Sequence, residues 1–333
     1  MPCQQSPPAV IMVRPAVFYS NPETAADNAF QSAVGMDQED LLLKAQEEFD
    51  NFVSILRDTV KLSLDSLLSR LDVESTTVEP SQVEVTVLQD VAQPPKPDAI
   101  FPNNWFTTHA DGTFVIYPML APTRRLERRL LNRLLAQLQF LGYNVKRSVD
   151  FTRLEETGSF LEGTGALVFD CPNRVVYVAL SQRATSEGLA QWGSRFPDYE
   201  VVSFSALDAR DVPIYHTNVM LTVGTDFALV CLDSVKDEED KARLQTKLMD
   251  TGKEIIPLSL SQVDNFAGNA FELRGCDGVH RLVLSETAFS SLTEPQLAIL
   301  GKYVEVVPVP LRTIEISGGS ARCMLAANFL PLA

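Results

Sequence analysis

The sequence lacks several features that would place it in other classes of protein. Its 333 residues include no run of about 18 uncharged apolar residues, the length a membrane-spanning helix needs. The first residues show no basic patch followed by an apolar stretch, so we expect no secretory signal and a cytoplasmic location. Neither a glycine-rich nucleotide loop nor a metal-ligand spacing occurs, which predicts chemistry without a cofactor or a metal.

Paired cysteines and excess positive charge are also missing. The five cysteines, an odd number without paired spacing, argue against a zinc cluster or a disulfide framework. There are 28 basic and 43 acidic residues, and the net charge of −15 repels phosphate backbones and anionic lipids. We therefore expect a reduced protein whose partner is a small molecule, with neither nucleic acid nor membrane as a partner. A homo-oligomer is left open.

What the sequence does contain is a repeated unit in which a helix precedes a β-rich segment. The expected helices cover residues 38–60, 123–141, 185–196, 237–251 and 293–300. The β-rich segments that follow them lie near 83–87, 144–146, 199–202, 254–257 and 303–307. Matching positions in these units recur at intervals of 49 to 58 residues, and such a period indicates a repeat architecture. Hairpins at 165–180, 219–232 and 271–284 fill the gaps.

Polar, reactive side chains stand at roughly equivalent places in the five units. They follow the unit markers Glu84, Gly142, Pro197, Gly252 and Gly301 by 17 to 25 residues, and they are His109, Glu162, His216, Asn269 and Cys323. If the five units close around an axis, these side chains converge at its centre. The spacing therefore predicts an active site built by pseudo-symmetry.

Cys323 is the candidate nucleophile. It follows Gly318 and Gly319, which allow a close approach of backbone or substrate, and a thiolate beside an imidazole is a reactive nucleophile. His216 stands beside Asn218 at a unit junction, which favours a general acid/base role over that of an ordinary buried histidine. A buried structural cysteine is the alternative reading, and the glycine context and unit position disfavour it.

Two further charged residues have roles that the sequence leaves less defined. Glu162 follows Phe160 and Leu161, so we expect it to be partly buried and to need a cationic or N–H partner. Arg183 follows a strand directly, and there it could clamp a substrate carboxylate or simply be an exposed arginine.

The boundaries predict one catalytic domain over residues 9–333. Residues 1–8 are expected to form a disordered tail. The Ser-, Thr-, Glu- and Pro-containing stretch 64–82 is expected to be a surface insertion within the domain.

Four segments resemble the signature segments of the amidinotransferase-related citrulline-utilisation hydrolases. They are residues 101–106, 161–165, 215–219 and 318–324, and they occur in the same order as in that family. The Met12–Pro15 opening and the stretch Asn265–Asn269 match as well. These hydrolases belong to the guanidine-modifying, or pentein, superfamily with arginine deiminase and dimethylarginine dimethylaminohydrolase. The resemblance implies an α/β fold, a five-bladed propeller with pseudo-fivefold symmetry.

The resemblance also implies roles for individual residues. Cys323 would attack the central carbon of a guanidinium or ureido group, and His216 would protonate the leaving nitrogen and then activate water. Glu162 would bind substrate nitrogen and steady His216. Arg183 matches a position that binds the substrate α-carboxylate. The expected substrate-binding set is completed by Asn103, Phe106, His109, Asn218 and Asn269.

Two departures from the family pattern bear on the substrate. The segments around His109 and Asn218 resemble those of arginine deiminases, but at these two positions arginine deiminases carry aspartates that hold the guanidinium cation. A desolvated cation without its counter-charges costs several kcal/mol, whereas a neutral ureido group can be met by amide and imidazole groups. We therefore expect citrulline to be cleaved to ornithine, ammonia and carbon dioxide. An arginine deiminase, an amidinotransferase and a catalytically dead binding module are the alternatives.

Overall fold

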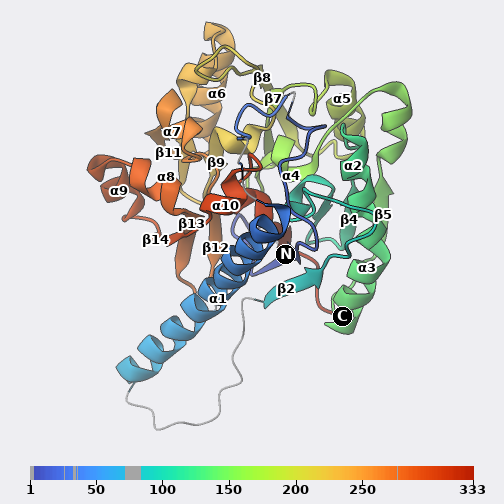
Figure 1. Ribbon diagram of the computed structural model, residues 1–333. Helices are drawn as coiled ribbons and strands as arrows, with labels where there is room; N and C mark the ends of the chain where they lie inside the picture. The colour runs from blue at the N-terminus through green and yellow to red at the C-terminus, as the bar shows by residue number, and fades with distance from the viewer. Residues whose placement is uncertain (1–3, 26, 33–34, 36, 72–83, 276) are drawn as a thin grey trace.

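The computed structural model describes residues 4–25, 27–32, 35, 37–71, 84–275 and 277–333 (Figure 1). Its named strands form five three-stranded sheets. In each sheet the middle strand runs antiparallel to one neighbour and parallel to the other. The five α/β units predicted from the repeat are therefore confirmed.

The strands of each sheet come from consecutive chain segments, with one exception. Four sheets are β3 (Phe106–Thr108), β4 (Thr113–Ile116) and β5 (Arg147–Asp150); β6 (Val168–Asp170), β7 (Val175–Leu180) and β8 (Glu200–Ser205); β9 (Leu221–Val223), β10 (Phe227–Val230) and β11 (Glu254–Pro257); and β12 (Phe271–Arg274), β13 (His280–Ser285) and β14 (Glu305–Val309). The exception joins both ends of the chain, because β1 (Ala9–Arg14) lies between β2 (Glu84–Gln89) and β15 (Ala326–Asn328).

Helices make the crossovers that parallel neighbours require. They connect the middle strand of each sheet to its parallel partner, and they are α1 (Gln38–Leu71), α2 (Pro122–Arg125) with α3 (Leu131–Phe140), α5 (Ser186–Arg195), α6 (Glu238–Asp250), and α8 (Glu286–Ser291) with α9 (Glu294–Leu300). In Figure 1 these helices lie toward the outside and the strands toward the middle.

The strand expected at 144–146 is displaced to β5. Gly142, with a φ of +87°, ends α3 as the sequence predicts. Tyr143 then pairs with Leu332, and the amide of Asn144 donates to Pro331, so these residues hold the C-terminal segment instead of β4. The expected helix 123–141 is also divided, because a 3₁₀ turn over Leu126–Leu130 separates α2 from α3.

The predicted tail differs from the structure where it is described, and part of the predicted insertion is helical. Gln5 donates to the carbonyls of Phe169 and Val223, and Ser6 is buried, so this part of the expected disordered tail packs against two sheets. Residues 64–71 of the expected insertion continue helix α1. Residues 1–3 of the tail and 72–82 of the insertion lie outside the described residues.

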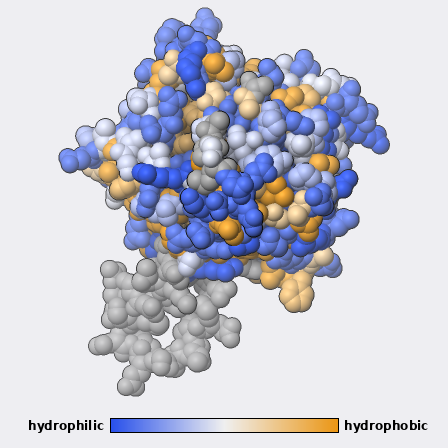
Figure 2. All heavy atoms as spheres, in the orientation of Figure 1, coloured by the Kyte–Doolittle hydropathy of each residue, from blue (hydrophilic) through white to orange (hydrophobic). Residues whose placement is uncertain are grey.

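The face in Figure 2 is mostly hydrophilic, with small hydrophobic patches scattered over it. In the described part of the chain, none of the helices combines the length and the apolar character needed to cross a membrane.

Candidate active site

The polar side chains lie just before the strand that runs antiparallel to the middle strand of each sheet. His216 precedes the 3₁₀ turn Thr217–Val219, Glu162 precedes α4 (Gly163–Ala166), and Cys323 lies in the 3₁₀ turn Ala321–Met324. Asn269 stands just before β12. Because the five sheets are built alike, these equivalent positions come together from segments far apart in the sequence.

The sulfur of Cys323 is buried and surrounded by amide groups. Its Sγ lies 3.3 Å from Nδ2 of Asn269 and 3.7 Å from Nδ2 of Asn218. Asn269 is itself fixed, since its Oδ1 accepts from the backbone amide of Arg322 and its Nδ2 also donates to the carbonyl of Asn218. Two amide N–H groups therefore face the sulfur, as a nucleophile that develops negative charge requires.

Glu162 and His216 form a buried pair. Nε2 of His216 lies 2.9 Å from Oε2 of Glu162, and the other carboxylate oxygen accepts from the backbone amide of Leu120. Burial opposes ionisation of Glu162, but the positive charge of Arg183 and the hydrogen bond from His216 lower its pKa to about 2. Burial lowers the pKa of His216 despite its carboxylate partner, so the imidazole is neutral at pH 7.

A glycine permits this close packing. A Cβ at Gly165 would lie 2.4 Å from Nδ2 of Asn104 and 2.6 Å from Nδ1 of His216, too near for any side chain. Gly318 has a φ of +82°, and a Cβ there would meet the side chain of Asn28. The glycines of two signature segments therefore let the reactive side chains approach one another.

Two buried arginines stand beside the pair. Arg124 donates to both oxygens of Glu127 and, at 2.8 Å, to Oδ1 of Asn104. Arg183 is also buried, and its Nε and Nη2 reach the two oxygens of Asp27 at 2.7 and 2.6 Å. Both guanidinium groups approach Oε2 of Glu162 to 3.7 Å. They keep that carboxylate ionised in a site away from water.

These side chains border a small cavity of about 10 Å³, roughly the space of one water molecule. Cys323, His216 and Arg183 line it, together with Asp98, Phe101, Asn104, Arg124 and Tyr215. Thr24 and Asn28, from the segment between β1 and α1, form part of the wall. An amino-acid substrate can enter only if part of this wall is displaced.

The structure brings some of the expected substrate-binding residues to this site and places others elsewhere. Asn218 and Asn269 contact the sulfur of Cys323. Arg183 lines the cavity, and its guanidinium group forms two hydrogen bonds with the carboxylate of Asp27. Asn103 is fully buried, and in the described part of the chain its side-chain atoms have no hydrogen-bond partner.

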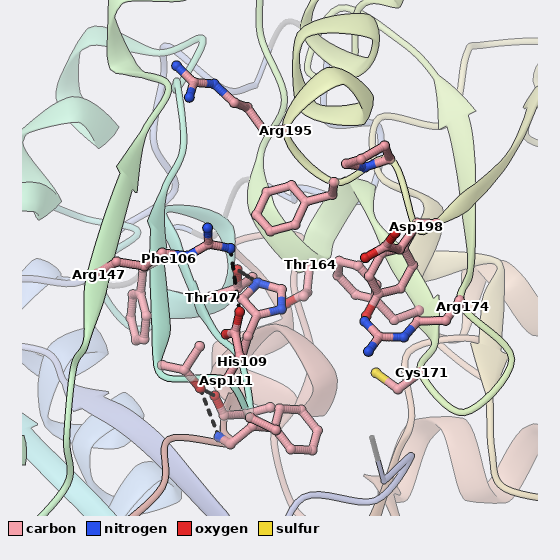
Figure 3. A pocket seen from close by; sticks show the side chains of 18 residues that line it. Phe106, Thr107, His109, Asp111, Arg147, Thr164, Cys171, Arg174, Arg195 and Asp198 are labelled. Carbon is pink, nitrogen blue, oxygen red and sulfur yellow. Dashed lines mark hydrogen bonds and ion pairs between the residues drawn. The ribbon is translucent and has the colours of Figure 1, made fainter. Parts of the chain in front are cut away.

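The placement of His109 and Phe106 is corrected. Both line a separate cavity that neither Cys323 nor His216 borders (Figure 3). The reason is their position relative to β3. Asn103 and Asn104 lie before this strand, as the site residues of the other units lie before theirs, whereas Phe106 lies within β3 and His109 follows it. Three extended residues span roughly 10 Å, which carries His109 to the opposite end of the strand.

The residue that sequence reasoning missed at this position is Asn104. It follows Glu84 by 20 residues, within the 17 to 22 residues found in the other four units, while His109 follows by 25. The spacing was therefore sufficient to prefer Asn104. Arg124, Asp98 and Asp27 give no comparable signal, because the equivalent places in the other units do not carry polar residues at a regular interval.

The model of one protein family, described as "N,N dimethylarginine dimethylhydrolase, eukaryotic", matches residues 14–64 and 75–330. The chain belongs to this family. The family's description is that of a hydrolase acting on a guanidino compound, which agrees with the enzyme class predicted from the sequence, and the family supports membership of the pentein superfamily. The finer prediction, citrulline-utilisation hydrolases, stays a prediction. No curated protein matches the chain.

Solved structures of this superfamily share the fold. ArgZ, an arginine dihydrolase from the ornithine-ammonia cycle in cyanobacteria, superposes with a TM-score of 0.68 at 14% identity over 98% of this chain and 41% of that one. The product-bound N-terminal domain of ArgZ gives 0.64 at 15% identity, over 97% and 99% of the two chains. A dimethylarginine dimethylaminohydrolase adduct with 4-chloro-2-hydroxymethylpyridine gives 0.57 at 15% identity, over 96% and 99%. The chain thus spans under half of full-length ArgZ and has the five-bladed pentein fold.

Proposed function

We propose that the protein hydrolyses a C–N bond of a small, neutral ureido amino acid, and that this substrate is L-citrulline. The products are ornithine, ammonia and carbon dioxide. Cys323 is the nucleophile, His216 the acid and base, and Glu162 the group that orients the imidazole.

The reaction proceeds in two balanced halves. The thiol proton passes to Nδ1 of His216, and the sulfur of Cys323 bonds to the ureido carbon. The terminal C–N bond then breaks as the imidazolium protonates the leaving nitrogen, which departs as ammonia and leaves a thiocarbamate on the enzyme. Water, deprotonated by His216, attacks the same carbon and releases the thiol and a carbamate of ornithine, which loses carbon dioxide.

The observation that carries the choice of a neutral substrate is the orientation of Asn104. Its Oδ1 accepts the 2.8 Å hydrogen bond from Arg124, which directs Nδ2 away from that arginine. Nδ2 is buried and has no hydrogen-bond partner in the part of the chain that the structure describes. A ureido carbonyl oxygen can accept from this N–H group, whereas a guanidinium group offers only donors.

The charges around the cavity support the same choice. Arg124 and Arg183 add two cations to its wall, and the only carboxyl among the described residues that line it is that of Asp98. Burial raises the pKa of Asp98, and the charge of Arg124 and a hydrogen bond from Asn21 oppose this rise. A guanidinium cation entering the cavity would therefore lie beside two like charges and one carboxyl among the described lining residues.

The same arginines suit the amino-acid end of the substrate. Arg183 can meet an α-carboxylate with two parallel hydrogen bonds once its contact with Asp27 opens. Opening that contact also frees the segment that carries Thr24 and Asn28, which is the part of the wall an entering substrate has to displace. We assign Arg183 to carboxylate binding on this basis.

A guanidino amino acid, N,N-dimethylarginine or arginine, is the second candidate. The description of the matching family and the carboxyl of Asp98 in the cavity wall favour it. Both candidates use the same nucleophile and base, and they differ in whether the group held by Asn104 and Asp98 is neutral or cationic.

A product assay separates the two. The purified protein is incubated with L-citrulline, L-arginine or N,N-dimethyl-L-arginine, and ornithine, ammonia, dimethylamine and carbon dioxide are quantified. The proposal expects ornithine, ammonia and carbon dioxide in equal amounts from citrulline. Release of dimethylamine and citrulline from dimethylarginine, with no ornithine from citrulline, would instead establish the second candidate.

A further inference from the structure

A second cavity lies apart from the proposed active site. Its volume is about 290 Å³, close to the lower end of the range for small-molecule sites and much larger than the cavity beside Cys323. None of Cys323, His216 and Glu162 lines it. Its wall comes from the end of β3, the turn between β6 and β7, the end of α5 and the end of β15.

Aromatic rings make one side of this cavity flat. The imidazole of His109 stacks on Phe196, with ring centres 5.4 Å apart and planes 22° from parallel, and it meets Phe169 edge-on. Phe196 is backed by a second stacked ring, that of Trp192. Burial lowers the pKa of His109 to about 4, so the ring is uncharged at neutral pH. A planar ligand can pack against such a surface.

Positive groups border the aromatic side. Figure 3 shows Arg147 and Arg174 on either side of His109, with Arg195 farther away at the rim. The guanidinium of Arg174 lies 5.3 Å over the ring of Tyr199. Arg147 donates to Thr113 through Nε and approaches Asp111 at 3.4 Å, which positions its guanidinium at the cavity.

The charged residues that line this cavity are mainly positive, whereas the chain as a whole is negative. Three arginines line it against two aspartates, Asp111 and Asp198, although the protein carries a net charge of −15. The backbone of Arg174 also has a φ of +54°, a conformation that is uncommon for a residue with a side chain. A concave, apolar pocket with cations at its edge concentrates small anions.

We propose that this cavity binds a small aromatic anion. The planar ring lies against the imidazole of His109, which Phe196 supports from behind, and the anionic group, a carboxylate or a phosphate, is held by Arg147 and Arg174 through charge-assisted hydrogen bonds. The site lies apart from the small cavity beside Cys323, since the two cavities share no lining residue among those described.

Calorimetric titration of the full chain tests the proposal and separates the two sources of negative charge. The probes are adenosine 5′-monophosphate for a phosphate, 2-aminobenzoate for a carboxylate, and inorganic phosphate as an anion without a ring. At least one ring-bearing probe should bind about tenfold more tightly than inorganic phosphate, and the tighter of the two identifies the anionic group.

Three variants locate the binding. Arg174→Gln should weaken the ring-bearing probe about tenfold, as expected when a charge-assisted hydrogen bond is lost. His109→Ala should weaken the ring-bearing probe and leave inorganic phosphate unaffected. Arg133→Gln, which changes an exposed arginine on α3, is the matched control and should bind as the wild type does. Absence of binding by both ring-bearing probes, or equal affinity in Arg174→Gln and Arg133→Gln, overturns the proposal whatever the protein hydrolyses.

Discussion

Nε2 of His216 carries the proton in its 2.9 Å contact with Oε2 of Glu162. A carboxylate whose pKa is lowered to about 2 is ionised at neutral pH and can only accept. A neutral imidazole that donates from Nε2 keeps a lone pair on Nδ1. The pair thus leaves a base at Nδ1, next to Gly165, and holds the ring in one orientation.

Replacing Glu162 with glutamine tests this arrangement. Glu162→Gln should lower kcat by at least about a hundredfold, because the imidazolium loses its counter-charge. The neutral base exists above the pKa of His216, which burial lowers below 6.5, so the wild-type kcat/KM should fall only below that pH. Since Glu162 raises the pKa of His216, the acid limb should move to still lower pH in the variant. An unchanged limb in the pH profile would show that His216 is not the group that titrates.

The nucleophile is tested by Cys323→Ser. The variant should lose at least about a thousandfold in kcat, because the covalent route is removed. The control is Cys171→Ala, which changes another buried free cysteine outside the small cavity and should retain activity. Mass spectrometry after treatment with a haloacetamidine should show one adduct, on Cys323. Turnover retained in Cys323→Ser would end the covalent mechanism.

The close approach at Gly165 gives a prediction about geometry. In Gly165→Ala the new Cβ meets Asn104 and His216 well inside contact distance, so the imidazole has to move and kcat should fall about a hundredfold. Gly193→Ala is the matched control, because no atom lies within 4 Å of its Cβ and α5 should gain roughly 0.5–1 kcal/mol. Circular dichroism and steady-state kinetics on both variants separate loss of function from loss of fold.

Asp27 competes with the substrate for Arg183 if that arginine binds the α-carboxylate. Asp27→Asn should then lower KM roughly tenfold, the equivalent of about 1.4 kcal/mol, with little change in kcat. Asp50→Asn breaks another two-pronged Arg–Asp contact, with Arg14 on the surface, and should leave both constants unchanged. A raised KM in Asp27→Asn would mean that Asp27 orients Arg183 for the substrate and does not compete with it.

The repeat of helix and strand was strong enough to predict the five units, because each helix has start and stop signals and each β segment follows at a regular interval. The same regularity located Glu162, His216, Asn269 and Cys323. It failed at His109, where two polar segments flank a strand of only three residues and the wrong flank was chosen. It could not find Arg124 or Asp27, since buried arginines and their carboxylate partners meet through tertiary contacts that leave no periodic trace.

The sequence pattern also could not predict how the two ends of the chain pair in one sheet. β1 and β15 lie at opposite ends of the chain, and their pairing joins residues whose separation in sequence no local signal spans. The displacement of β5 has a similar origin, because Tyr143 and Asn144 pair with the C-terminal segment. Both outcomes depend on contacts between the ends of the chain and its middle.

The variant Asn104→Asp tests whether the side chain at this position determines the preference for a neutral or a cationic substrate. A carboxylate in place of the amide removes a donor to the ureido oxygen and adds a charge-assisted bond to a guanidinium, worth roughly 1.5–3 kcal/mol. The ratio of kcat/KM for citrulline to that for arginine should therefore fall by about tenfold or more. The companion variant Asn218→Asp puts the charge within contact of Cys323, so it should slow both substrates and change the ratio less.

The most direct test of the account is the ratio of kcat/KM for L-citrulline to that for L-arginine in the wild-type protein, with N,N-dimethyl-L-arginine measured beside them. Nδ2 of Asn104 is buried without a hydrogen-bond partner among the described residues, and two arginines lie in the cavity wall, so we predict that citrulline is preferred by at least about tenfold. Equal or faster turnover of either guanidino substrate would contradict the account, because the neutral amide would then not decide which substrate the enzyme accepts.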